Sequence, residues 1–119
     1  MTQVKKEQPA IDVRALLVAR FGEGEVSKWE KQFAPRKLNV IIVEDKFCVL
    51  RPVTATEVSE FSIMTATPDI GLEKASRYII GELWIDGDNE IQDDEEYFIS
   101  AMLQIQKAME LKKSSFYRL

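Results

Sequence analysis

Apolar and polar positions along this chain follow two different periods, which together predict a mostly helical α+β protein. Apolar residues recur every three to four positions in four or five segments, the spacing of amphipathic helices. Around residues 38–51 the pattern changes to two short runs rich in β-branched residues, which predicts one antiparallel hairpin with strands at about 38–43 and 47–51. Residues 1–8 are polar and expected to be loose, and residues 9–119 are expected to form a single domain.

The most regular helical pattern covers about residues 70–84. Its apolar and small residues fall at i, i+3, i+4, i+7, i+8 and i+11, which predicts a core stripe of Leu72, Ala75, Ser76, Ile79, Ile80 and Leu83. Thr54 and Glu57 have the spacing of a capping box, which predicts the start of another helix. Further helices are predicted from Pro9 to Phe21, through Val26, Trp29 and Phe33, and from Asp94 to about Lys113.

Cys48 lies in the second predicted strand, where it alternates with Phe47 and Val49 and is expected to share a face with Leu50. It is either a small buried hydrophobic residue or a reactive thiol. A reactive thiol needs a neighbouring base, and the chain contains no histidine, so the buried interpretation is favoured. A single cysteine also excludes an internal disulfide and fits a reducing compartment.

Residues 83–98 join the two most periodic segments and combine acidic residues, glycine and bulky aromatics. Asp86 and Gly87 favour a turn, because a short polar side chain bonds nearby backbone and glycine accepts positive φ. Asp93 and Glu96 have the D-x-x-E spacing of a helix cap, and carboxylates suit the positive end of a helix dipole. The segment is therefore predicted to be an acidic turn that enters the last helix.

A calcium loop is the alternative interpretation of the same segment. An EF-hand loop starting at Asp86 would need glycine at its sixth position and glutamate at its twelfth, but Ile91 and Tyr97 stand there. The acidic turn is therefore favoured, and no metal is expected. Trp84 follows a core stripe directly, so its ring is expected to be largely buried and to anchor the turn against the last helix.

Composition narrows the possible functions. The 119 residues are 45% hydrophobic and 30% charged, as in a globular protein that is neither disordered nor membrane-spanning, and the first residues lack the apolar core of a signal peptide. A cytoplasmic protein is therefore expected. A net charge of −4 argues against a nucleic-acid partner. Without histidine or a glycine-rich phosphate loop, we expect neither an enzyme nor a cofactor; a carboxylate-pair hydrolase stays an alternative that no residue spacing favours.

Two motifs, at a characteristic distance, resemble a known family. The first is a strand, short acidic turn and strand that ends in Arg51-Pro52 and leads into a Thr/Ala-rich helix. The second is Trp84-Ile85-Asp86-Gly87-Asp88, followed by the acidic run that contains Asp93 and Glu96 and opens a helix. Over about residues 26–119 this arrangement resembles the small tail assembly chaperones of long-tailed phages and prophages.

The resemblance implies a non-enzymatic protein of the host cell cytoplasm, without a cofactor. Members of that family bind and escort the long, aggregation-prone tape-measure protein while the tail assembles, and are normally absent from the finished particle. The predicted Pro9–Phe21 helix has no counterpart in the family pattern. A third hypothesis is that the protein is a structural component of the tail, in which case it would be found in purified phage particles.

The last helix suggests where a protein partner would bind. Its core stripe is predicted to be Phe98, Ala101, Met102, Ile105, Ala108 and Met109. Ile99 and Leu103 fall outside that stripe, one turn apart among charged residues. Either the helix is buried more widely, or the pair forms a contact ridge for a client helix or a second copy of the chain. Met102 and Met109 alongside would let such a ridge adapt to different sequences.

An alternative function uses the acidic segment instead. Seven of the eleven residues from Asp86 to Glu96 are acidic, which would steer a basic protein surface by long-range attraction. The chain would then be a small inhibitor or adaptor that mimics a polyanion. Salt separates the two functions, because polyanion mimicry weakens steeply with ionic strength and apolar client binding does not.

Overall fold

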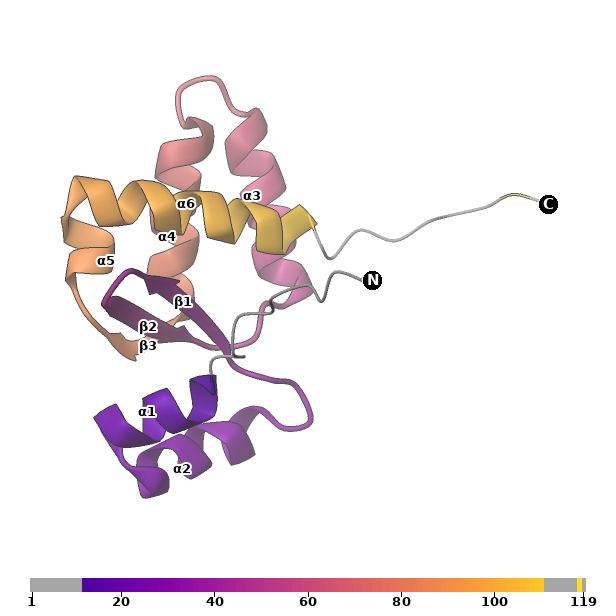
Figure 1. Cartoon of the computed structure of the whole chain (residues 1–119). Coiled ribbons are helices and arrows are strands. Elements are labelled where there is room, and N and C mark those ends of the chain that lie inside the picture. The colour runs from indigo at the N-terminus through magenta and orange to yellow at the C-terminus, as the bar shows by residue number, and fades with distance from the viewer. Residues whose placement is uncertain (1–11, 111–117, 119) are drawn as a thin grey trace, which may run out of the picture.

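The hairpin predicted from the β-branched runs is present at the centre of the structure, a computed structural model that describes residues 12–110 and residue 118. Its strands are β1 (Asn39–Val43) and β2 (Lys46–Leu50), which pair antiparallel across a two-residue turn. Both strands are apolar on nearly every residue. This follows from their position, because helices cover both faces of the sheet and neither face needs to be polar (Figure 1).

The sheet has three strands, so the prediction of a hairpin alone was wrong. β3 (Trp84–Gly87) pairs antiparallel with β2, and the strand order is β1-β2-β3. The sequence pattern predicts a helix end at Trp84 and a turn at Asp86 and Gly87. The sequence does not indicate this strand, because it has only four residues, follows a helix without a break and pairs with a strand far away in the sequence.

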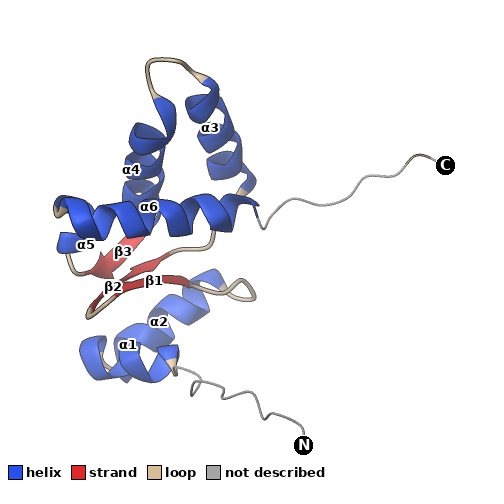
Figure 2. Cartoon of the chain, turned by 45° about the horizontal axis from the view of Figure 1, so that its top comes forward, coloured by secondary structure: helices blue, strands red, loops and turns tan. Residues whose placement is uncertain are grey.

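The helices form two layers around the sheet. One face is covered by α1 (Val13–Phe21) and α2 (Glu23–Phe33), and the other by α3 (Ala55–Ala66), α4 (Gly71–Leu83) and α6 (Glu95–Glu110), as Figure 1 and Figure 2 show. Side chains alternate between the two faces. Cys48 and Leu50 pack with the larger helical layer, whereas Phe47 and Val49 pack with α1 and α2. The predicted common face of Cys48 and Leu50 is confirmed.

The helical core stripes are also confirmed. In α4, all the predicted stripe residues are buried except Leu72, which is partly exposed and packs against the core. Phe61 is buried in α3, and the capping box of Thr54 and Glu57 is formed. Val26 and Trp29 of α2 are buried against the sheet, so the N-terminal pair of helices contributes its own apolar cluster.

The helices differ from the prediction in number. α1 begins at Val13, where the Asp12 carboxylate accepts a hydrogen bond from the Ala15 N–H and caps the helix; the predicted start at Pro9 lies outside the described residues. A short helix, α5 (Glu90–Asp93), brings the number of helices in the described residues to six, against the four or five predicted. The segment 1–8 and the predicted helix end at Lys113 lie outside the described residues.

Candidate interaction surface

The two sequence motifs meet in the structure at the β2–β3 pairing. Leu50 lies opposite Trp84, and the Arg51 N–H donates to the Leu83 carbonyl at 2.8 Å. Pro52 is buried directly beyond this contact. Trp84 is partly buried and packs against the main core cluster, and part of its side chain stays open to solvent because it lies on an edge strand.

Gly87 makes the closest approach in the motif. It lies opposite Cys48 with a φ of +150°, and a Cβ on this residue would lie 2.4 Å from the Cys48 Cα and 2.7 Å from the Phe47 carbonyl oxygen. Only glycine fits this backbone contact. The residue predicted to serve a turn therefore serves strand pairing.

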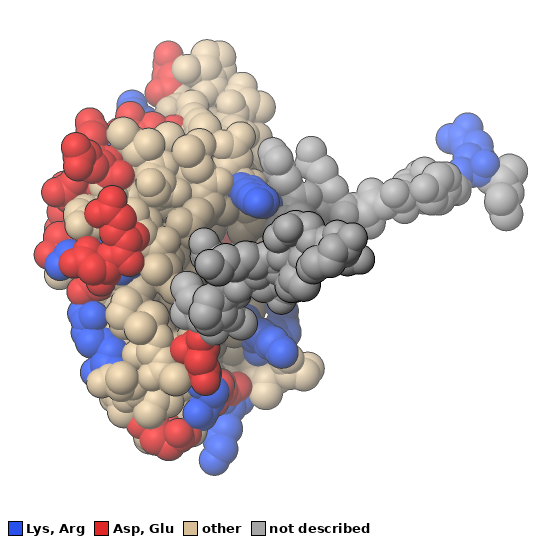
Figure 3. Space-filling view, viewed as in Figure 1, with Lys and Arg blue, Asp and Glu red and all other residues tan. Residues whose placement is uncertain are grey.

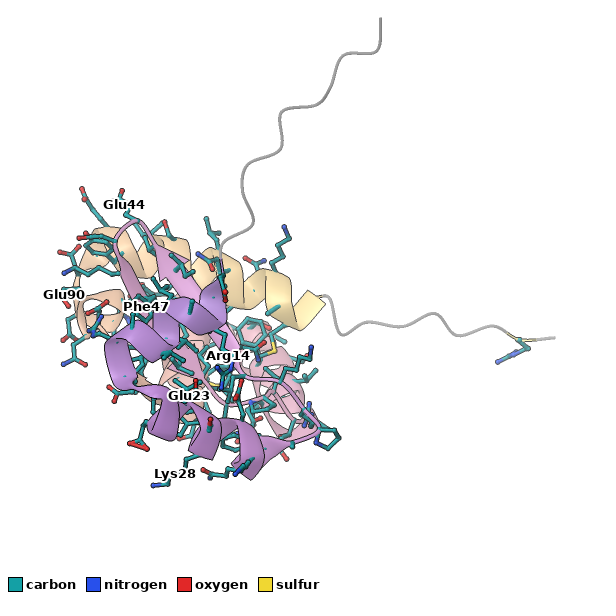
Figure 4. The ribbon with its side chains drawn as sticks, turned by 60° about the horizontal axis from the view of Figure 1, so that its bottom comes forward. Arg14, Glu23, Lys28, Glu44, Phe47 and Glu90 are labelled. Atoms are coloured by element: carbon teal, nitrogen blue, oxygen red, sulfur yellow. The ribbon has the colours of Figure 1, made fainter. Side chains whose placement is uncertain are left out.

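Asp88 ties three parts of the fold together. Its carboxylate pairs with Arg20 of α1 at 2.5 Å and accepts a hydrogen bond from the Phe47 N–H at 2.9 Å, and its side chain is only 12% exposed. The Arg20 hydrogen bond is the main cause of the lowered pKa of Asp88, and the Phe47 N–H adds to it. Arg20 also lies over the Phe47 ring, 5.2 Å from its centre. Asp88 is therefore a structural carboxylate that links α1 to the hairpin. Figure 4 labels Phe47, the hairpin residue in this contact.

The Arg-Pro motif has a similar structural role. Both terminal guanidinium nitrogens of Arg51 donate to the buried Glu57 carboxylate at 3.2 Å, and the Thr54 N–H donates to it at 2.7 Å. Burial acts to raise the pKa of Glu57, but the hydrogen bonds from Arg51 and Thr54 outweigh it and lower the pKa to about 2. This charged network joins the end of β2 to the start of α3.

The rest of the acidic segment lies at the surface. Glu90 pairs with Lys46 at 3.4 Å, and Glu95 lies 3.9 Å from Arg77. The cap of α6 is Asp94, whose carboxylate accepts from the Glu96 N–H at 3.0 Å, so the predicted cap at Asp93 was off by one residue. Asp93 instead ends α5, a helix whose four residues gave no periodic signal in the sequence.

The hairpin turn adds to this acidic face, which the sequence did not indicate. Glu44 and Asp45 are exposed at the turn, and the Asp45 carboxylate accepts a hydrogen bond from the Tyr97 hydroxyl at 3.3 Å. Figure 3 shows the acidic side chains gathered along the left side of the molecule, with a few basic side chains among them. The two segments are far apart in sequence, so only the fold could bring them together.

The apolar pair of the last helix is at the surface. Ile99 is 48% exposed and Leu103 is 55% exposed, so the interpretation of a more widely buried helix was wrong within the described residues. Of the two methionines proposed beside them, Met102 is half-buried, whereas Met109 is 7% exposed and belongs to the core. We call Ile99 and Leu103 the α6 ridge.

Two other large apolar side chains are exposed in the described residues. Ile63 of α3 is 64% exposed, and Tyr78 of α4 is 40% exposed, with its hydroxyl donating to Glu60 at 3.3 Å. Tyr78 therefore has a polar partner, and Ile63 has no second large exposed apolar side chain beside it on α3. The α6 ridge differs from both because its two members are adjacent on one helix face.

In residues 12–110, no group of three or more potential ligands is placed to hold a metal ion. Over the same residues, no helix combines the length and apolar character needed to cross a bilayer. Burial raises the pKa of the Cys48 thiol to about 12, and the side chain is fully enclosed, so the thiol interpretation is set aside in favour of a core role.

The geometry defines a three-layer α+β protein with a charged surface and an exposed apolar ridge on its last helix. Comparison of the chain with protein-family models, with curated proteins and with solved structures found no match.

Proposed function

We propose that this chain is a non-enzymatic, cytoplasmic tail assembly chaperone-like protein that binds a tape-measure-like client through the α6 ridge. The observation that carries the proposal is the exposure of Ile99 and Leu103 side by side on a helix that already contributes a buried stripe to the core. The buried residues of that stripe are Phe98, Ala101, Ile105 and Met109. Adjacent exposed apolar side chains with charges around them mark surfaces that bind other proteins. The resemblance of the two motifs to phage tail assembly chaperones supplies the class of client.

The α6 ridge suits a helical client. Residues four apart on a helix present one continuous apolar strip, which is the shape that another amphipathic helix packs against. Met102 lies half-buried beside the strip, and its flexible thioether can follow different client side chains. Client binding would bury the exposed parts of the Ile99 and Leu103 side chains.

The test is co-purification of the full chain with a candidate client, which would be a very long, helix-rich protein if an adjacent gene encodes one. The double change Ile99→Ser, Leu103→Ser should leave the far-UV circular dichroism spectrum unchanged but weaken binding by roughly 30- to 150-fold. This follows from about 2–3 kcal/mol for the apolar burial that the two serines remove. Ile63→Ser is the matched control, since it removes an exposed apolar side chain from another helix.

The three possible outcomes of this test distinguish a binding role of the α6 ridge from a structural one. Loss of client binding in the double variant, with Ile63→Ser binding normally, supports the ridge. Equal binding by all three proteins contradicts it. Unfolding of the double variant would also contradict it, because it would show that these side chains stabilise the fold.

A second candidate function rests on the acidic face in Figure 3, which suits docking on a basic protein. The negative charge that this face can offer to a basic partner is reduced, because Asp88 pairs with Arg20, and Glu90 and Glu95 already have cationic neighbours. This function predicts that binding weakens steeply with salt and that Asp93→Asn, Glu96→Gln impairs it. Client binding through the ridge predicts little change in either experiment.

A further inference from the structure

The outer edge of β1 carries backbone groups with free hydrogen-bonding capacity. The strand order makes β1 an edge strand, and the Gln104 amide donates to the Ile42 carbonyl at 3.0 Å from outside the sheet. Successive residues of a strand direct their backbone groups to opposite sides. The Val40 N–H and C=O therefore point outward as well, and no described residue hydrogen-bonds to them.

Among the described residues, Gln104 covers this edge at Ile42, and the part of the edge at Asn39 and Val40 is open. A groove of about 530 Å³ borders it on the α1 side and includes Leu38 and Val40 in its wall. A smaller hollow of about 240 Å³ lies on the other side, next to Lys37 and Asn39. Edge strands are normally protected by lysine, proline or a bulge, and the sequence of β1, Asn-Val-Ile-Ile-Val, contains neither residue. The irregularity in the sheet lies between β2 and β3.

Charges at the two ends of β1 are opposite in sign. Arg36 and Lys37 precede the strand, and Glu44 and Asp45 follow it at the hairpin turn, where Figure 4 labels Glu44. A second β1 running antiparallel would place its acidic end beside the basic end of the first. By symmetry the same contact would occur at the other end, so the pattern is complementary to itself.

We propose that β1 pairs antiparallel with β1 of a second copy of this chain, and that the two sheets become one six-stranded sheet across a two-fold axis. Val40 would lie opposite Val40 of the second copy, and each would satisfy the other's outward N–H and C=O. In this register Arg36 faces Glu44 of the second copy, and Ile42 lies opposite Leu38 of the second copy, whose N–H would take the place of the Gln104 amide at the Ile42 carbonyl. The surface is distinct from the α6 ridge, so this inference goes beyond the proposed function.

The first test measures mass and backbone protection on the full chain. Sedimentation equilibrium over a wide concentration range should show a monomer–dimer equilibrium. Amide hydrogen exchange should show the Val40 N–H protected in the dimer and rapidly exchanging in the monomer. The Ile41 N–H, which faces β2, should stay protected in both and serves as an internal control. A monomer at every concentration, or a dimer with a rapidly exchanging Val40 N–H, would overturn the proposal.

The second test exchanges the charges. In the same register Lys37 lies on one sheet face with Asp45 of the second copy, as diagonal neighbours. Lys37→Glu alone and Asp45→Lys alone should each weaken the dimer about tenfold, because two attractive contacts per dimer become repulsive. The double variant should recover wild-type affinity. Lys37 is the better cation to change, since Arg36 also donates to the Val53 carbonyl within its own chain. Additive weakening in the double variant would show that the two ends do not meet.

The third test removes the outward donor. Val40→Pro deletes an N–H that faces away from β2 and should give a monomer that retains its helices. Should that variant fail to fold, the charge exchange still decides the question. Ile99→Ser, Leu103→Ser should stay dimeric, and its loss of dimer would move the contact to the α6 ridge and overturn the β1 pairing.

Discussion

The contact at Gly87 gives the sharpest test of the fold, by substitution to alanine. The new Cβ would lie 2.4 Å from the Cys48 Cα and 2.7 Å from the Phe47 carbonyl oxygen, both of which belong to the backbone of β2 and cannot rotate away. The residue also has a φ of +150°, a conformation that alanine disfavours. Gly87→Ala must therefore separate β3 from β2 or distort both strands.

The expected cost follows from these two effects. Overpacking of a closely fitted site costs about 1–3 kcal/mol, and a non-glycine residue held in an unfavourable backbone region costs a similar amount. Together they predict a loss of about 4 kcal/mol in the free energy of unfolding. With a urea dependence of about 2 kcal/mol/M, the unfolding midpoint should fall by about 2 M.

Gly81→Ala is the matched control. Gly81 lies inside α4, and an added Cβ would have no atom within 4 Å. Alanine favours a helix by about 1 kcal/mol over glycine, so the midpoint should rise by about 0.5 M. Urea unfolding followed by far-UV circular dichroism measures both variants. A Gly87→Ala protein within about 1 kcal/mol of wild type would show that β3 does not approach β2 as closely as described.

One further substitution tests the buried charge, and a labelling experiment tests the buried thiol. The pKa of Glu57 is lowered from 4.5 to about 2, so its ionised carboxylate contributes about 3 kcal/mol to the free energy of unfolding above pH 4.5. This contribution is lost as the pH falls toward 2. Glu57→Gln should not show this loss when urea unfolding is measured at a series of pH values. An equally steep loss in the variant would place the acid sensitivity elsewhere. Cys48, with a pKa raised to about 12, should react with a thiol reagent only after unfolding, and fast labelling of the native protein would contradict its burial.

The helices and the central hairpin could be predicted because their signals are local. The stripe of α4 repeats over three turns, and the β-branched runs of β1 and β2 differ from everything around them. A helical stripe indicates burial whatever packs against it. The exposure of Ile99 and Leu103 could be predicted only as one of two alternatives, because the width of the buried face depends on what covers the helix.

The third strand and the acidic face could not be predicted, since both depend on residues distant in sequence. β3 is a strand only because β2 offers an edge for it, and Trp84 and Ile85 by themselves continue the apolar pattern of α4. Glu44 and Asp45 join the acidic segment only because the hairpin turn folds toward Tyr97. The pairing of Arg20 with Asp88 spans 68 residues and left no local signal.

The motif that carries the family resemblance also makes the most demanding contacts within the fold. Gly87 admits no side chain, Asp88 fastens α1 to the hairpin, and Arg51 neutralises a buried carboxylate. Residues under such constraints specify the fold and are not free to specify a partner. A variant at Asp88 that fails to bind the proposed client is therefore informative only when its free energy of unfolding matches that of wild type. Changes in the α6 ridge lack this ambiguity, because those side chains are exposed and can change binding while the fold stays intact.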